Sequence, residues 1–181
     1  LAGGGLRVVP LTIHVPLAEV PRLVDGPLIE RTTEILAAAL VRDFGLAQPR
    51  IVIAGLNPHA GESGTIGRED EDILAPAVMR LRARGLAVTG PRSADTLFHP
   101  AARAGYDAVV AMYHDQALIP VKTLAFDEGV NVTLGLPFVR TSPDHGTAFD
   151  IAGTGRANPA SLMAALALAD EIAARRAAAA S

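Results

Sequence analysis

Short, almost purely apolar runs that alternate with helical patterns constrain the fold of this chain more than any other feature. Three runs are rich in β-branched residues and lack polar alternation, as in strands buried on both faces: residues 6–13 (LRVVPLTI), 50–55 (RIVIAG) and 106–113 (YDAVVAMY). Three segments have apolar residues at helical spacing or helix-terminal signals: residues 27–44, 69–84 and 158–176. This alternation predicts an α/β domain with a largely parallel sheet, covered by helices on both faces.

Composition excludes several classes of function. The 181 residues are 50% hydrophobic and carry a net charge of -3, so there is no basic excess for nucleic-acid binding. There are no cysteines, which excludes disulfides, zinc–thiolate sites, iron–sulfur clusters and thiol catalysis. Any metal must therefore be held by His, Asp or Glu. No apolar run approaches the roughly 20 residues of a membrane span, and no signal peptide is evident, so we expect a cytoplasmic protein.

Three histidines directly follow the predicted strands, namely His14, His59 and His114. Because ligands sit beyond the carboxyl ends of parallel strands, we expect all three at one edge of the sheet. Three imidazoles on a divalent ion leave coordination positions open for substrate, as in catalytic metal sites. A single histidine at a strand end is more often an ordinary hydrogen-bonded residue, and the spacing alone leaves both interpretations open. His99 is expected to cap or pack at a helix edge, and His145 to make a structural hydrogen bond.

The loop of residues 55–67 (GLNPHAGESGTIG) holds four glycines between a predicted strand and a predicted helix. Its backbone amides could approach an anion, but it matches neither a Walker motif nor a dinucleotide fingerprint. The acidic first turn of the following helix (residues 69–72) would also repel phosphate. The loop is better interpreted as a shaped segment that presents His59.

Residues 113–153 are the densest in polar candidates. Lys122, Asn131 and Arg140 are scattered among apolar residues, and a Lys and an Arg near a metal suit a substrate with phosphate or carboxylate groups. They could equally be surface cations and a turn residue. Asp115 and Asp144 each neighbour a histidine, and they could orient it by accepting a hydrogen bond or be turn residues.

Several blocks in fixed order resemble the 4-hydroxythreonine-4-phosphate dehydrogenase family of pyridoxal phosphate (vitamin B6) biosynthesis. The blocks are NPHAGE, ADTLF, MYHDQ, GVNVTLGLPFVRTS, DHGTA and the AGTGRA that follows, and together they span most of the chain. The resemblance implies the two-domain α/β fold of the isocitrate and isopropylmalate dehydrogenases. It also implies NAD-dependent oxidation of 4-phosphohydroxy-L-threonine, followed by decarboxylation to 3-amino-2-oxopropyl phosphate.

The resemblance also assigns roles to the candidate residues. His14, His59 and His114 match the family's ligands for a divalent metal (Zn, Mg or Co), which are contributed across a homodimer interface. Lys122, Asn131 and Arg140 match the residues that contact the phosphorylated hydroxy amino acid. No residue is assigned as catalytic, and the residues that bind NAD are not identified.

The chain resembles only the C-terminal half, or slightly more, of the family's members. We therefore expect residues 1–156 to form most of one metal- and substrate-binding domain. Residues 157–181 should form a helix that packs on the absent N-terminal domain, leaving a face of Leu162, Leu166 and Ile172 partly exposed here. Two alternatives remain open: a paralogous dehydrogenase for threonate or erythronate 4-phosphate, and a truncated, non-catalytic metal-binding dimerisation module.

Overall fold

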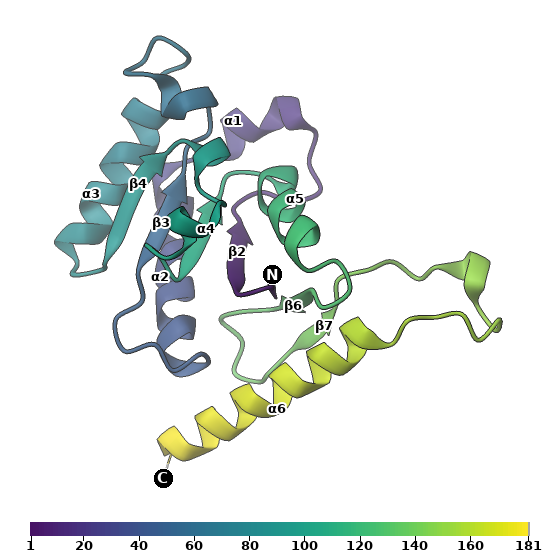
Figure 1. Ribbon diagram of the computed structural model, residues 1–181. Coiled ribbons are helices and arrows are strands. Elements are labelled where there is room, and N and C mark those ends of the chain that lie inside the picture. The colour runs from purple at the N-terminus through teal and green to yellow at the C-terminus, as the bar shows by residue number, and fades with distance from the viewer. Residues whose placement is uncertain (181) are drawn as a thin grey trace.

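A seven-stranded sheet forms the centre of the computed structural model, which describes residues 1–180 (Figure 1). Its strands lie in the order β4 (Val88–Arg92), β3 (Ile51–Ala54), β5 (Ala108–Ala111), β2 (Leu6–Pro10), β1 (Ala2–Gly3), β6 (Val130–Val132) and β7 (Thr141–Pro143). The predicted α/β fold and its parallel strands are confirmed, since β4, β3, β5 and β2 run parallel.

The other half of the sheet is antiparallel, so the expectation of a largely parallel sheet holds for β4, β3, β5 and β2 and not for the remaining strands. Strands β1 and β2 pair as a hairpin through Gly4 and Gly5, both at positive φ. Glycine pairs favour this tight turn because its central residues require φ above zero. Strand β1 then pairs with β6, and β6 with β7, both antiparallel.

Alternate residues of the central strands enter two separate cores, one on each face of the sheet. Ile51 and Ile53 pack with α2 (Gly26–Arg42) and α3 (Ala75–Ala83), whereas Val52 and Ala54 pack in the core that includes the buried side of α5 (His114–Leu124). This explains why the strands read as continuous apolar runs in the sequence.

The helices agree with the sequence where capping signals are clear. Asp25 precedes α2 and its side chain accepts a hydrogen bond from the Leu28 amide at 2.7 Å, with Pro27 in the first turn. The predicted helix of residues 69–84 forms as a π-helical turn, η3 (Asp70–Leu74), continued by α3. The remaining short helices are α1 (Val20–Leu23), α4 (Pro100–Arg103), η1 (Leu17–Glu19), η2 (Pro58–Gly61), η4 (Ala94–Thr96) and η5 (Phe149–Ile151).

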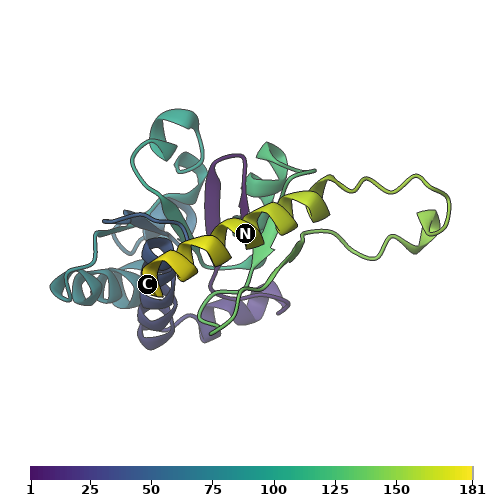
Figure 2. The same ribbon diagram turned by 90° about the horizontal axis from the view of Figure 1, so that it is seen from below.

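The C-terminal helix α6 (Ala160–Ala180) packs along β6 and β7 and touches α2, and Figure 2 shows it from below. Its buried residues include Ala165 and Ile172, whereas Leu162 and Leu166 are about half exposed. The prediction of an exposed face is thus wrong for Ile172, which is only 1% exposed because it packs within this chain. Among residues 1–180, no helix is both long enough and apolar enough to span a bilayer.

A buried carboxylate ties α6 to the end of α2. The side chain of Asp43 is 1% exposed and accepts hydrogen bonds from Arg42 (2.7 and 2.9 Å) and from Arg176 of α6 (2.7 and 2.9 Å). Burial opposes ionisation of this carboxyl, but the bonds and charges of the two guanidinium groups prevail and lower its pKa to about 2.

We expect the stabilising effect of Asp43 to depend on pH. Because its folded pKa lies below its unfolded value of 3.8, the contribution is present above about pH 4 and is lost as pH falls towards 2. The shift corresponds to about 2 kcal/mol of unfolding free energy. Denaturant titrations from pH 2 to 7 should show this loss in the wild type, and Asp43→Asn should lack it. Glu19→Gln, which breaks the exposed pair with Arg22, serves as control; an unaltered pH dependence in Asp43→Asn would contradict the argument.

Candidate metal and substrate site

The three candidate metal ligands lie at one edge of the sheet. His14 follows β2, His59 lies in η2 after β3, and His114 begins α5 after β5. Strands β3, β5 and β2 are parallel neighbours, so their carboxyl ends point to the same side. The sequence prediction of a common edge therefore holds for the backbone positions.

Two of the three imidazoles form a pair. The ring centroids of His14 and His114 are 5.8 Å apart, and His114 Nδ1 is 2.7 Å from Asp115 Oδ1. That contact leaves Nε2 of His114 for a metal or substrate, which is how carboxylates orient ligating histidines. A zinc–nitrogen bond is about 2.1 Å long, so rings at this separation can both reach one ion. The donor set of this pair therefore fits a divalent metal.

His59 is not grouped with this pair within one chain. Its Nδ1 lies 3.6 Å from Glu62 Oε1, and its side chain is 62% exposed. No three His, Cys, Asp or Glu side chains among residues 1–180 are placed to hold one metal ion together. One copy of the chain thus offers two adjacent imidazoles and a third on a separate exposed loop.

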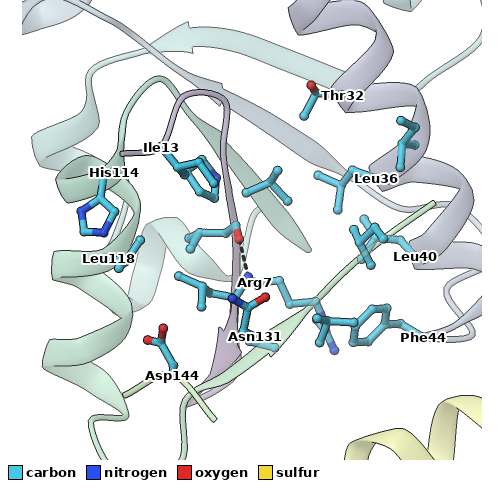
Figure 3. A pocket seen from close by; sticks show the side chains of 18 of the residues that line it. Arg7, Ile13, Thr32, Leu36, Leu40, Phe44, His114, Leu118, Asn131 and Asp144 are labelled. Carbon is cyan, nitrogen blue, oxygen red and sulfur yellow. Dashed lines mark hydrogen bonds between the residues drawn. The ribbon is translucent and has the colours of Figure 1, made fainter. Parts of the chain in front are cut away.

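The histidine pair lines a pocket of about 350 Å³. Figure 3 shows His114 from α5, Asn131 from β6 and Asp144 after β7 on one side, with Leu40 and Phe44 on the other. Arg7 and Thr32 also line the pocket, and the Arg7 guanidinium lies 4.9 Å from the centre of the Phe44 ring, so the pocket combines apolar walls with polar groups on both sides.

The structure brings two of the three candidate substrate residues near the pocket. Asn131 lines it, and Lys122 lies on the same face of α5 as His114, eight residues further on. The Lys122 ammonium donates to the backbone carbonyl of Asp144 at 2.9 Å and is 3.3 Å from its carboxylate. Arg140 is exposed and donates to Thr133 Oγ1 at 2.6 Å, and it does not line the pocket.

Asp144 lies in a different place from the one suggested by its position in the sequence. Its carboxylate contacts Lys122 and not the neighbouring His145, whose Nδ1 lies 3.0 Å from the Gly146 carbonyl oxygen. His99 is the N-cap of α4 and accepts from the Ala102 amide at 3.4 Å, which confirms the predicted helix-edge role.

The loop that carries His59 is organised by Asp70, which sequence reasoning treated only as part of an acidic helix start. Asp70 is 1% exposed and accepts from the backbone amides of Leu56 (2.8 Å) and Asn57 (3.0 Å). These amides therefore bind a carboxylate of the same chain, and not an external anion. The signal was present in the sequence, because the acidic residues Glu69 and Asp70 follow the glycine-rich loop after a single residue, Arg68.

The backbone of this loop is unusual for residues other than glycine. His59, Ala60, Glu62 and Ser63 all have φ between 44° and 57°, in the left-handed region. The pKa of the Glu69 carboxyl is lowered first by its own backbone amide and next by Asn57, whose Nδ2 donates to it at 2.8 Å. Such strained conformations persist when surrounding contacts hold them, and they concentrate at functional sites.

Residues 1–169 match the family model described as "Pyridoxal phosphate biosynthetic protein PdxA". The chain belongs to this family. Two relatives named 4-hydroxythreonine-4-phosphate dehydrogenase are closely similar. The protein from Erythrobacter litoralis is 62% identical over 98% of this chain and 53% of its own length, and that from Methylorubrum populi is 67% identical over 94% and 49%. The chain thus spans about half the length of its PdxA relatives.

Solved structures support the same assignment. The 4-hydroxythreonine-4-phosphate dehydrogenase from Klebsiella pneumoniae superposes with a TM-score of 0.83 at 46% identity, over 97% of this chain and 52% of its own. A terephthalate 1,2-cis-dihydrodioldehydrogenase from Burkholderia xenovorans superposes with a TM-score of 0.75 at 41% identity, over 93% and 53%. The PdxA fold is therefore shared with a dehydrogenase named for a different substrate.

Proposed function

We propose that this chain forms the metal- and substrate-binding part of an NAD-dependent 4-hydroxythreonine-4-phosphate dehydrogenase. The observation that carries the proposal is the pair of His14 and His114, 5.8 Å apart in the lining of a pocket, in a chain of the PdxA family. Oxidation of the substrate hydroxyl transfers a hydride to NAD and releases a proton. The resulting β-keto acid then loses carbon dioxide by cleavage of the bond to its carboxylate; the electron pair passes to the ketone as an enolate, whose carbon takes up a proton.

The residues of this chain would bind and orient the substrate. Lys122 offers an ammonium and Asn131 an amide, and both can donate hydrogen bonds to phosphate or carboxylate oxygens. We assign Arg140 to the same set, although it would have to leave Thr133 to reach a ligand. Fixing the anionic groups in this way holds the reacting carbon in place, which lowers the barrier by removing translational and rotational freedom.

A metal ion would be held by His14 and His114, with His59 of a second copy completing three imidazoles. Such an ion (Zn, Mg or Co) would supply electrophilic stabilisation for the negative charge that develops during oxidation and decarboxylation. Sharing of ligands between copies is supported by the exposure of His59 and by its separation from the pair within one chain. We therefore propose a homodimer as the metal-binding form.

Two alternatives would use the same residues differently. A paralogue acting on threonate or erythronate 4-phosphate would need the same phosphate and metal contacts but no contact to an amino group. A dihydrodiol dehydrogenase has a similar fold, so the fold alone does not determine which substrate is bound. A non-catalytic metal-binding dimer is the second alternative, since the chain spans about half the length of its relatives.

Native mass spectrometry with added zinc should show a dimer that holds about two zinc ions, because each proposed site takes ligands from both copies. The variant His59→Ala should lose the bound zinc, while His99→Ala, which alters only a helix cap, should keep it. A monomer without zinc would contradict the shared site for this chain. Zinc retained by His59→Ala would contradict the role of His59.

We propose to test activity in a chain of the relatives' length. We suggest a hybrid in which this sequence replaces the stretch of the Erythrobacter litoralis relative that it matches. With 4-phosphohydroxy-L-threonine, NAD and a divalent metal, the hybrid should form NADH and carbon dioxide. Faster turnover with erythronate or threonate 4-phosphate would favour the paralogue, and no turnover with any of these substrates would contradict the proposed dehydrogenase.

A further inference from the structure

Lys122 is the sole lysine in the sequence, and the other fifteen basic residues of this class are arginines. An ammonium is a compact point charge with three N–H donors, whereas a guanidinium is a wide planar fork. The ammonium of this one lysine lies beside the pocket that contains the histidine pair. Because the lysine side chain is flexible, the position of the Lys122 ammonium depends on the groups that contact it.

Asp144 provides two of the contacts that fix this ammonium. The Lys122 Nζ donates to the Asp144 carbonyl at 2.9 Å and lies 3.3 Å from its carboxylate. The ammonium also lies 5.9 Å from the centre of the Phe126 ring, and the two contacts with Asp144 leave one of its three N–H donors for an anionic ligand. The Asp144 side chain is 17% exposed and lines the same pocket as Asn131 and His114, so the ammonium is held at the border of that pocket.

Asp144 is in turn fixed from α6. Its backbone amide donates to the hydroxyl of Ser161 at 3.3 Å, and that hydroxyl donates to the Gly129 carbonyl at 2.8 Å. Ser161 is buried in the first turn of α6. Thus a continuous set of hydrogen bonds runs from the start of α6 through the end of β7 to the ammonium on α5.

We propose that Asp144 is the positioning residue for the Lys122 ammonium, and that Ser161 holds Asp144 in place from α6. The proposal rests on the proposed function in one respect only, namely that Lys122 binds an anionic group of the substrate. The link from Ser161 through Asp144 to Lys122 gives the docking of α6 a direct effect on substrate binding.

Chemical labelling of Lys122 tests this positioning without any activity. An acetylating reagent followed by mass spectrometry of peptides reports on Lys122, because the chain has no other lysine and the N-terminal amine lies on a different peptide. We expect Asp144→Asn to raise the labelling rate about three- to tenfold, because loss of the carboxylate removes the ion pair at 3.3 Å that holds the ammonium beside Asp144. Asp144→Glu, which keeps the charge but displaces it, should give an intermediate rate.

The matched control is Asp127→Asn, which removes a charge from the neighbouring segment, where Asp127 accepts from Asn158 at 3.2 Å. It should leave the labelling rate unchanged. Ser161→Ala should raise the rate less than Asp144→Asn does. Unchanged labelling in both Asp144 variants would overturn the proposal, and unchanged labelling in Ser161→Ala would remove Ser161 from it.

Kinetics of the hybrid separate positioning from a purely structural role. Asp144→Asn should raise KM for the phosphorylated substrate about tenfold and change kcat less than threefold, since the substrate anion loses a fixed partner. If Asp144→Asn only lowers the amount of active protein and leaves KM unchanged, Asp144 has a purely structural role and the proposal is overturned. If the wild-type hybrid does not turn over, the proposed function fails, and the labelling result still decides whether Asp144 positions Lys122.

Discussion

Replacing His114 by alanine is expected to reduce zinc affinity by more than about 100-fold and to reduce kcat/KM of the hybrid by at least as much. Removal of a partner that only orients a ligand already costs about 10- to 100-fold, so loss of the ligand itself should cost more. His114 makes both contacts that define the proposed metal site: its ring centroid lies 5.8 Å from that of His14, and its Nδ1 is 2.7 Å from Asp115. Zinc competition with a chromophoric chelator measures the affinity, and NADH formation measures the rate.

Graded variants distinguish a ligand from a residue that merely supports the loop. Asp115→Asn should cost about 10-fold in zinc affinity, because the imidazole keeps its nitrogen but loses its orienting carboxylate. His99→Ala removes an imidazole of similar size from a helix cap and should change neither quantity. Wild-type zinc affinity in His114→Ala would show that the histidine pair does not bind the metal, whatever the activity of the variant.

The edge at which the histidines lie could be predicted from sequence, but their grouping could not. Parallel strands place their carboxyl ends together, and short apolar runs identify such strands without further information. Whether the side chains meet depends on loop backbones, and both His14 and His59 have φ of 53°. A positive φ at a residue other than glycine is imposed by contacts elsewhere in the fold, so it cannot be predicted from the spacing of apolar residues. The carboxylate of Asp70, which fixes the loop of His59, is such a contact.

Two elements near the site were not predicted because their sequences contradict local propensity. Helix α5 contains Pro120 in its interior, which cannot donate a backbone hydrogen bond and normally ends a helix. Strand β4 contains Gly90 and Pro91, both of which disfavour strands. Packing overrides the propensity in each case: Ala117 and Val121 of α5 are fully buried against the sheet, and Val88 of β4 is 2% exposed. The eight-residue spacing that aligns Lys122 with His114 becomes visible only once α5 is known to be a helix.

Replacing Lys122 by methionine is expected to reduce kcat/KM of the hybrid by about 10- to 100-fold. Methionine keeps much of the length and apolar contact of the lysine side chain but removes the ammonium. A hydrogen bond between a charged group and its partner contributes about 1.5–3 kcal/mol, which corresponds to this range. Lys122→Arg should reduce kcat/KM by a comparable factor. The wider guanidinium cannot keep both contacts with Asp144, at 2.9 and 3.3 Å, and also donate to a ligand in the pocket.

The comparison of the two variants decides what Lys122 contributes. Arg22→Met removes the same charge from an exposed pair with Glu19 and should leave kcat/KM unaltered, so it controls for the change in net charge. Full activity in Lys122→Arg would show that only the sign of the charge matters and that its exact position does not. Full activity in Lys122→Met would show that the substrate's anionic groups are bound elsewhere, for instance by Arg140 after it leaves Thr133.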